Sequence, residues 1–162
     1  MKIKNKILVS LLSILLLFSL MFTGCTKYQD ILVVYDFNTG KDYMQIDMKG
    51  EKEFSIDFLH SVNLSNVKEK YTIDGNEIVC DTLVYSAFGA GMPDDLDPSL
   101  TLSYDSEGHM VVSGYNIRFN NKNPLTLAVS IPYDHILTVG DKEYSLGDIA
   151  GHGTVITISY IK

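Results

Sequence analysis

Hydrophobic and polar residues alternate along much of the chain with the two-residue period of β-strands. The strictest case is the segment 53–59, in which Phe54, Ile56 and Phe58 share one face while Ser55 takes the other. Residues with high strand propensity gather in further short segments of this kind. The segments predicted as strands are 31–37, 43–48, 53–59, 71–73, 77–88, 100–104, 110–113, 115–119, 125–131, 136–139 and 154–161.

Turn-forming residues separate these segments at intervals of about ten residues. An Asp-Gly-Asn sequence at 74–76 joins two of the segments and predicts a β-hairpin. A short turn of helix is possible at 144–149, but no segment after residue 25 has a sustained helical period. The pattern therefore predicts a single antiparallel all-β domain, either a sandwich or a flattened barrel of about nine to twelve strands.

The first 25 residues have a different pattern, which is typical of secretory signals. Three lysines among the first six residues precede the apolar segment 7–22, which is shorter than the roughly 20 residues that a membrane-spanning helix needs. A Phe-Thr-Gly tripeptide before Cys25 resembles the lipobox of bacterial lipoprotein signals. We therefore expect a helical signal peptide over 1–24, cleavage before Cys25 and lipidation of its thiol.

Cleavage at that point leaves one domain on a short tether. Residues 25–30 would form the lipidated cysteine and its tether, which spans at most roughly 17 Å, and 31–162 would form the domain. The signal peptide contains three lysines and no acidic residue, so its removal takes the formal net charge from −7 to −10. So acidic a surface disfavours binding to nucleic acid or to anionic lipid headgroups. We expect the domain at the extracytoplasmic face of the cell membrane, held by the lipid on Cys25.

The residue types that bind metals or attack substrates are sparse. Lipidation of Cys25 leaves Cys80 without an intramolecular partner, and its strand-forming neighbours predict a buried, unreactive thiol. Four histidines are scattered without the spacing of metal ligands. Asp94, Asp95 and Asp97 could offer oxygen ligands to Ca²⁺, but their spacing differs from that of a calcium loop and favours a solvated acidic loop. We therefore expect no metal and no cofactor.

Two short motifs stand where predicted strands end, and such positions commonly carry binding residues. A His-Ser-Val sequence begins at His60, and a Gly-Ala-Gly-Met-Pro sequence begins at Gly89. We expect the two motifs on neighbouring strands, with Glu69 between them in the sequence. The candidate ligand-binding residues are His60, Ser61, Glu69, Gly89, Ala90 and Gly91.

The order of these motifs resembles a bacterial and archaeal family of domains of unknown function, whose genes often lie beside those of TAXI-class TRAP transporters. The resemblance extends over about residues 43–93 and includes the strand before His60, Glu69 and both motifs. It implies an extracytoplasmic partner of solute uptake and no particular catalytic activity. The expected partners are TRAP transporter subunits, which the resemblance implies, or a small carboxylate, which the histidine and glycine motifs could bind.

His60 has two interpretations at this stage. Because it follows Phe58 by two positions, it could continue the buried face, with its ring nitrogens bonded to backbone groups. Alternatively, it could donate a hydrogen bond to a carboxylate ligand, with Ser61 and the backbone amides of the glycine motif completing the site. Both interpretations remain open on the sequence.

Catalysis is the least supported function. Ser61 adjoins His60, but neighbouring residues of a strand point to opposite faces, so the two do not readily form a catalytic dyad. The chain has neither a Gly-x-Ser-x-Gly elbow nor a cysteine–histidine pair. We therefore expect a non-enzymatic accessory lipoprotein of a TAXI-type uptake system that binds a small ligand or a partner protein. The alternatives are a structural envelope lipoprotein without a ligand and, least favoured, a hydrolase.

Overall fold

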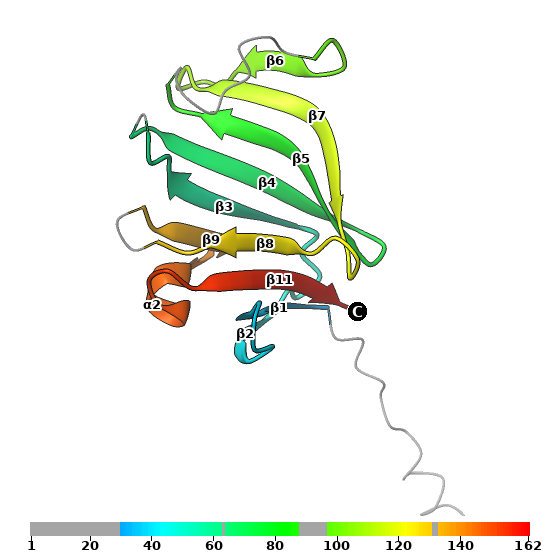
Figure 1. Ribbon diagram of the computed structural model, residues 1–162. Helices are drawn as coiled ribbons and strands as arrows, with labels where there is room; N and C mark the ends of the chain where they lie inside the picture. Colours follow the sequence, from blue (N-terminus) through cyan, green and yellow to red (C-terminus); the bar gives the residue numbers. More distant parts are fainter. Residues whose placement is uncertain (1–29, 63, 88–96, 131–132) are drawn as a thin grey trace, which may run out of the picture.

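The computed structural model describes residues 30–62, 64–87, 97–130 and 133–162 (Figure 1). The predicted signal peptide, its cleavage site and the whole Gly-Ala-Gly motif lie outside these residues. In the part of the chain that the structure describes, no helix has the length and apolar character needed to cross a membrane.

The described residues form eleven strands and one short helix, arranged as two antiparallel sheets (Figure 1). The smaller sheet has the strand order β2-β1-β11-β8, and the larger has the order β10-β9-β3-β4-β5-β7-β6. The elements are β1 (Ile31–Asp36), β2 (Asp42–Asp47), β3 (Glu53–Leu59), β4 (Asn66–Asp74), β5 (Glu77–Tyr85), β6 (Thr101–Tyr104), β7 (Met110–Phe119), β8 (Leu125–Ala128), β9 (His135–Val139), β10 (Lys142–Ser145), α2 (Leu146–Ala150) and β11 (Val155–Ile161).

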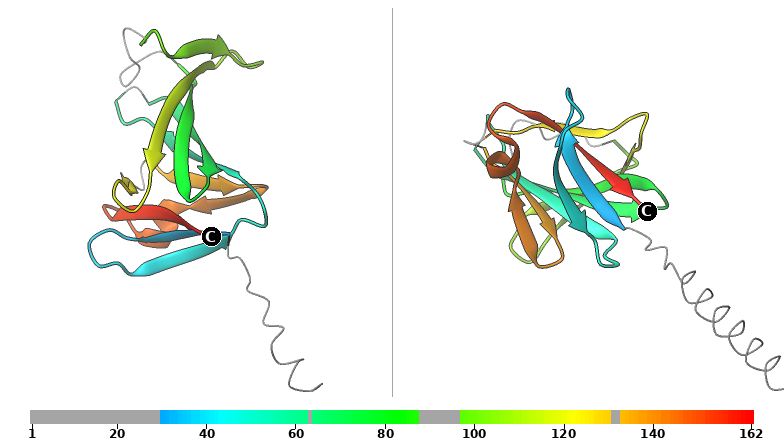
Figure 2. Two further views of the ribbon diagram at one scale, coloured as in Figure 1. Left: turned by 90° about the vertical axis from the view of Figure 1, so that its right-hand side faces the viewer. Right: turned by 90° about the horizontal axis from the view of Figure 1, so that it is seen from below.

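The two sheets pack through a hydrophobic core that lies over one part of the larger sheet (Figure 2). Leu32 and Ile158 enter this core from the smaller sheet, and Ile56 enters it from the larger. The ring of Tyr71 stacks on that of Phe54 with 4.8 Å between centroids. Each aliphatic side chain buried in this way stabilises the fold by about 1.5–3 kcal/mol. We call the face of the larger sheet that bears Ile56 and Tyr71 its inner face.

The larger sheet extends beyond the smaller one, so that β5, β7 and β6 rise away from it in Figures 1 and 2. A second hydrophobic cluster occupies the inner face there, with Val67, Tyr85, Met110 and Val112 buried at its centre. The inner face therefore has one part covered by the smaller sheet and another part with its own cluster. The opposite, outer face carries the alternate side chains of the same strands.

The predicted antiparallel β-domain is confirmed for the described residues, which form two sheets and no closed barrel. Three details of the prediction were wrong. β4 begins at Asn66, well before the predicted segment, and the polar strand β10 was not predicted. The two segments predicted at 110–119 form one strand, because Gly114 (φ +98°) and Asn116 (φ +47°) bend β7 within an irregular pairing to β5 without ending it.

Candidate functional site

His60 is the first residue after β3, and hydrogen bonds hold the turn that follows it. Its backbone N–H donates to the Ser65 carbonyl and its carbonyl accepts from the Leu64 N–H, both at 2.9 Å. The ring Nδ1 accepts from the Val62 N–H at 3.3 Å. In the neutral ring the proton is therefore on Nε2. Nδ1 is thus bonded to a backbone group, as the structural interpretation of His60 expected. Nε2–H is the group that could contact a ligand.

The turn after His60 presents hydrophobic side chains to solvent. Val62 is 71 % exposed and Leu64 is 62 % exposed, while Ser61 is exposed between His60 and Val62. Leu64 has φ +52°, a left-handed conformation that costs a residue with a Cβ about 1–2 kcal/mol. Strained backbone of this kind clusters at sites of function, and here the hydrogen bonds of the turn hold it in place. We call residues 60–62, 64 and 65 the His60 turn.

The strands that precede the two motifs end at the same edge of the larger sheet, but they are not neighbours as predicted. Both β3 and β5 pair antiparallel with β4, which lies between them. They are therefore parallel to each other and end at one edge. Asn66 of β4 donates to the Ser86 hydroxyl at 2.9 Å, and the Ser86 N–H donates back to the Asn66 carbonyl at 3.0 Å. Ser86, which follows β5, therefore lies beside Asn66, the residue that follows the His60 turn. The Gly-Ala-Gly residues themselves lie outside the described residues.

Glu69 lies away from the His60 turn, in the middle of β4. It is four residues beyond Ser65, a distance of about 14 Å along a strand. Its carboxylate accepts a hydrogen bond from the Tyr71 hydroxyl, two positions further on the same face. The structure therefore separates Glu69 from His60 and brings it together with Tyr71.

The inner-face residues in register with Glu69 on the other strands of the sheet are hydrophobic. Opposite it are Ile56 on β3 and Leu83 on β5. The whole row in register with Glu69 consists of Tyr144, Leu137, Ile56, Leu83, Val112 and Leu102. Glu69 is therefore one carboxylate in a row of hydrophobic side chains.

This environment changes the acid–base properties of the neighbouring groups. Burial raises the pKa of Glu69, and the hydrogen bond from Tyr71 opposes that rise. Burial and then the charge of Glu69 raise the pKa of Tyr71. Burial raises the pKa of the Cys80 thiol to about 12, with further contributions from Glu69 and Asp81. Cys80 is buried as expected, and a thiol that stays protonated is a poor nucleophile.

Aromatic rings adjoin Glu69 on the inner face, and sequence analysis did not identify them. Tyr85 hydrogen-bonds to Tyr115, and its pKa is raised by burial, by Tyr115 and by the charge of Glu69. Phe58 stacks on His135 with 5.1 Å between ring centroids. The His135 Nδ1 is buried without a hydrogen-bond partner among the described residues, and burial lowers the pKa of the ring, which favours its neutral form.

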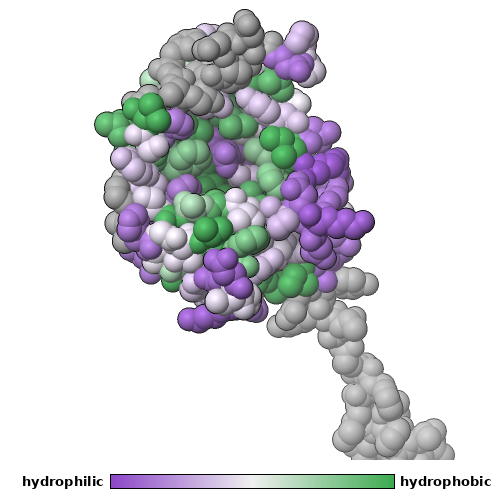
Figure 3. Space-filling view, in the orientation of Figure 1, coloured by the Kyte–Doolittle hydropathy of each residue, from purple (hydrophilic) through white to green (hydrophobic). Residues whose placement is uncertain are grey.

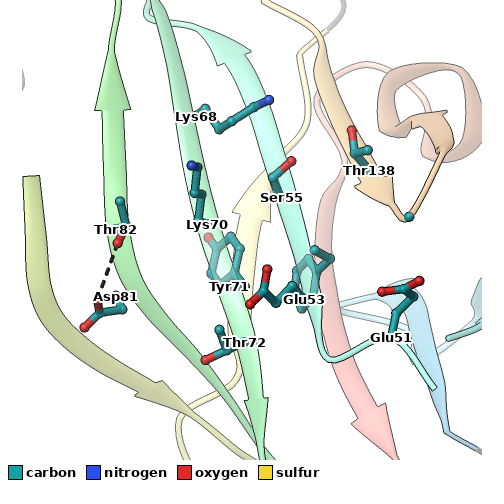
Figure 4. Close-up of a pocket in the computed structure, with 12 residues that line it drawn as sticks. Glu51, Glu53, Ser55, Lys68, Lys70, Tyr71, Thr72, Asp81, Thr82 and Thr138 are labelled. Atoms are coloured by element: carbon teal, nitrogen blue, oxygen red, sulfur yellow. Dashed lines mark hydrogen bonds between the residues drawn. The ribbon is translucent and has the colours of Figure 1, made fainter. Parts of the chain in front are cut away.

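The outer face of the larger sheet carries a polar groove of about 440 Å³ (Figure 4). Lys68 and Lys70 project into it from β4, next to Ser55 of β3 (Figure 4). Carboxylates of Glu53 and Asp81 also line the groove. Because the two lysines are balanced by acidic neighbours, this groove has no strong preference for an anion. It is best described as the solvated face of the sheet.

Metal ligands do not gather in the described part of the chain, where no group of three His, Cys, Asp or Glu residues could hold an ion. Asp94 and Asp95 of the predicted acidic loop lie outside that part. Asp97 accepts hydrogen bonds from the backbone N–H and the hydroxyl of Ser99, at 2.8 and 2.7 Å. Its carboxylate thus stabilises the turn before β6.

Comparison with known proteins finds one family. A family model described as "Domain of unknown function (DUF1850)" matches residues 54–146, more than half of the chain. The match begins within β3 and ends at the first residue of α2, and it includes His60 and Glu69. No curated protein and no solved structure matches the chain.

Proposed function

The chain belongs to the DUF1850 family, and we propose that it is a non-enzymatic accessory lipoprotein of a TAXI-class TRAP solute uptake system. Domains with the order of motifs found here are often encoded beside such transporters, which supports the proposal. In this function the domain would contact a transporter subunit or the transported solute. It would not transform a substrate.

The location is part of the proposal. Lipid on Cys25 would hold the domain at the extracytoplasmic face of the membrane, where the solute-binding subunits of uptake systems work. The tether to β1 is short, at most roughly 17 Å, so the domain would stay close to the bilayer. Its acidic surface has little affinity for anionic headgroups, so the lipid anchor would supply most of the membrane attachment.

The observation that carries the proposal is the exposed His60 turn. Val62 and Leu64 hold hydrophobic side chains in solvent on a turn fixed by backbone hydrogen bonds. Adjacent exposed hydrophobic side chains with polar neighbours are typical of protein interfaces. His60 Nε2–H and the Ser61 hydroxyl would supply the polar contacts beside them. The turn therefore supports a protein partner more strongly than it supports a small carboxylate, whose binding would rest on His60 and the glycine motif.

The test is binding of the full-length lipidated chain, in detergent micelles, to purified subunits of a TAXI-class TRAP transporter from the same cell. We expect the double variant Val62→Ser, Leu64→Asn to weaken binding at least about tenfold, because truncating contacts at the centre of an interface costs more than 1 kcal/mol. The matched control is Phe37→Ser, which removes another exposed hydrophobic side chain from the turn between β1 and β2.

Two results would overturn the proposal. One is that the unaltered chain binds none of the transporter subunits. The other is that the double variant binds as tightly as the chain with Phe37→Ser. The first result would favour the alternative, a structural envelope lipoprotein. The second would show that the His60 turn is not the surface that contacts the transporter.

A further inference from the structure

Glu69 is a charged group in an otherwise hydrophobic place. The positions in register with it on the two adjacent strands hold Ile56 and Leu83, and the row continues with hydrophobic residues to both sides. A carboxylate in such a place loses solvation, and it persists in folded proteins where it has a partner or a function. Glu69 lies at a boundary of the inner face, between Ile56, which belongs to the core beneath the smaller sheet, and Val112, which belongs to the second cluster.

No cation balances this carboxylate within the described residues. Its hydrogen-bond donor is the Tyr71 hydroxyl, which is neutral, and the described lysines, arginine and histidines form no ion pair with it. Lys68 and Lys70 adjoin Glu69 in the sequence, but both project into the groove on the outer face (Figure 4). The sheet lies between those lysines and the carboxylate, so the inner face has an uncompensated negative charge.

Aromatic rings stand in the next row of the inner face. Phe58 of β3 and Tyr85 of β5 flank Val67 on β4, two positions from Glu69. Tyr85 lies diagonally across from Glu69 on the adjacent strand, and Tyr115 packs against the same hydrophobic cluster. The faces of such rings attract cations, and their hydroxyls offer further hydrogen bonds.

The surface over this region is accessible in part. In Figure 3, the molecule is hollowed above the smaller sheet, and hydrophobic and hydrophilic atoms lie side by side in the hollow. At the β6 end of the two rows, Leu102 and Tyr104 are exposed by 39 % and 60 %. Glu69 and Leu83 are both half-buried, so a partly accessible carboxylate lies beside a partly accessible hydrophobic side chain. Such a pairing suits a small-molecule site, in which apolar contacts give affinity and a polar group gives orientation.

We propose that the inner face of the larger sheet binds a small ligand through a cationic amine group, which pairs with the Glu69 carboxylate. The ammonium donates hydrogen bonds to Glu69 beside the Tyr71 hydroxyl, and the rings of Tyr85 and Phe58 adjoin its positive charge. The hydrocarbon part of the ligand packs on the half-buried side chain of Leu83. A ligand whose only charge is a carboxylate is repelled from this site, because the charge already present is negative. The site is separate from the His60 turn, so it neither requires nor excludes a transporter partner there.

The test uses two probes of similar size and opposite charge, phenethylammonium and 3-phenylpropionate, with the full-length protein in neutral detergent micelles. Chemical shifts of backbone amides are followed during titration at neutral pH. We expect phenethylammonium to shift amides of β4 and β5 around Glu69 and Tyr85 to saturation, while 3-phenylpropionate leaves them unchanged. Glu69→Gln should weaken phenethylammonium binding at least tenfold, and Glu143→Gln, which neutralises an exposed glutamate on β10, should not change it.

Three outcomes would overturn the inference. They are no saturable shift with phenethylammonium, equal shifts with both probes, and unchanged binding in a folded Glu69→Gln variant. The first two depend on the unaltered protein, so they decide the question even where the variant fails to fold. Loss of amine binding with intact transporter binding would refute this site alone, and the reverse would refute the proposed function alone.

Discussion

Single residues on the inner face of the larger sheet decide its chemistry. Glu69 is partly buried among aliphatic residues, and the Tyr71 hydroxyl is its hydrogen-bond donor among the described residues. Alternation along β4 places Val67, Glu69, Tyr71 and Ile73 on one face. That register was predictable in principle, because Tyr71 was expected to be in a strand. The sequence pattern did not reveal this strand before Tyr71, because residues 68–70 are all charged and strands are identified by hydrophobic alternation.

The pH dependence of stability follows from the raised pKa of Glu69. A raised folded-state pKa means that the stability contributed by this group is fully present below its ordinary pKa of 4.5 and is lost as the pH rises through the folded-state value. The Glu69→Gln variant stays neutral and does not undergo this loss. The free energy of unfolding of the variant, minus that of the wild type, should therefore increase between pH 4 and pH 7. Urea unfolding at several pH values measures it, and Glu143→Gln should give a constant difference.

His60 can be tested by separating its two ring nitrogens. The Asn side chain keeps an acceptor near the position of Nδ1 and lacks a donor at the position of Nε2, whereas Ala lacks both. We expect His60→Ala to lower the free energy of unfolding by about 1 kcal/mol through loss of the bond from Val62, and His60→Asn to lower it less. Both variants should bind transporter subunits more weakly. If His60→Asn binds like the wild type, the role of His60 is structural.

Strands and turns show which parts of a β-fold alternation predicts. β1 and β11 carry runs of buried residues and β3 alternates, and all three were identified from the sequence. β10 was missed because its four residues are polar and it is defined by pairing with β9 across a two-residue turn at Gly140. β7 was divided in two, because a glycine within a strand is also the signal of a turn. Pairing between strands, unlike alternation within one, is not written in a local pattern.

Gly114 holds β7 close to the segment that precedes β6. A Cβ at this position would lie 3.1 Å from the Ser99 carbonyl oxygen, and its φ of +98° is unfavourable for any other residue. We expect Gly114→Ala to lower the free energy of unfolding by about 2–3 kcal/mol. Gly40→Ala is the matched control, because Gly40 has φ +69° with open space around it and should cost about 1 kcal/mol. Urea unfolding of both variants measures the difference, and equal losses would show that the close approach to Ser99 carries no energy.

At the scale of the whole molecule, the fold separates two surfaces that the sequence suggested were one site. His60 and Glu69 were both expected to bind a ligand, but one lies in an exposed turn at the sheet edge and the other lies on the inner face. Sequence order gave no sign of this, because the direction of each side chain depends on the register of β4 with its neighbours. The predicted edge was nevertheless informative, since the end of β3 and the segment at Ser86 lie on either side of Asn66 there. We propose a protein partner for one of these surfaces and a small cation for the other.

The proposed function requires that the His60 turn contact an uptake system outside the cytoplasm. The most direct measurement is photocrosslinking in the native cells, with p-benzoylphenylalanine in place of Leu64 and, as the control position, in place of Phe37. Position 64 should crosslink to a TAXI-class TRAP subunit and position 37 should not, and the crosslink should be lost when Cys25→Ser removes the anchor. Absence of any transporter subunit among the crosslinks from position 64, or the same subunits from position 37, would contradict the account.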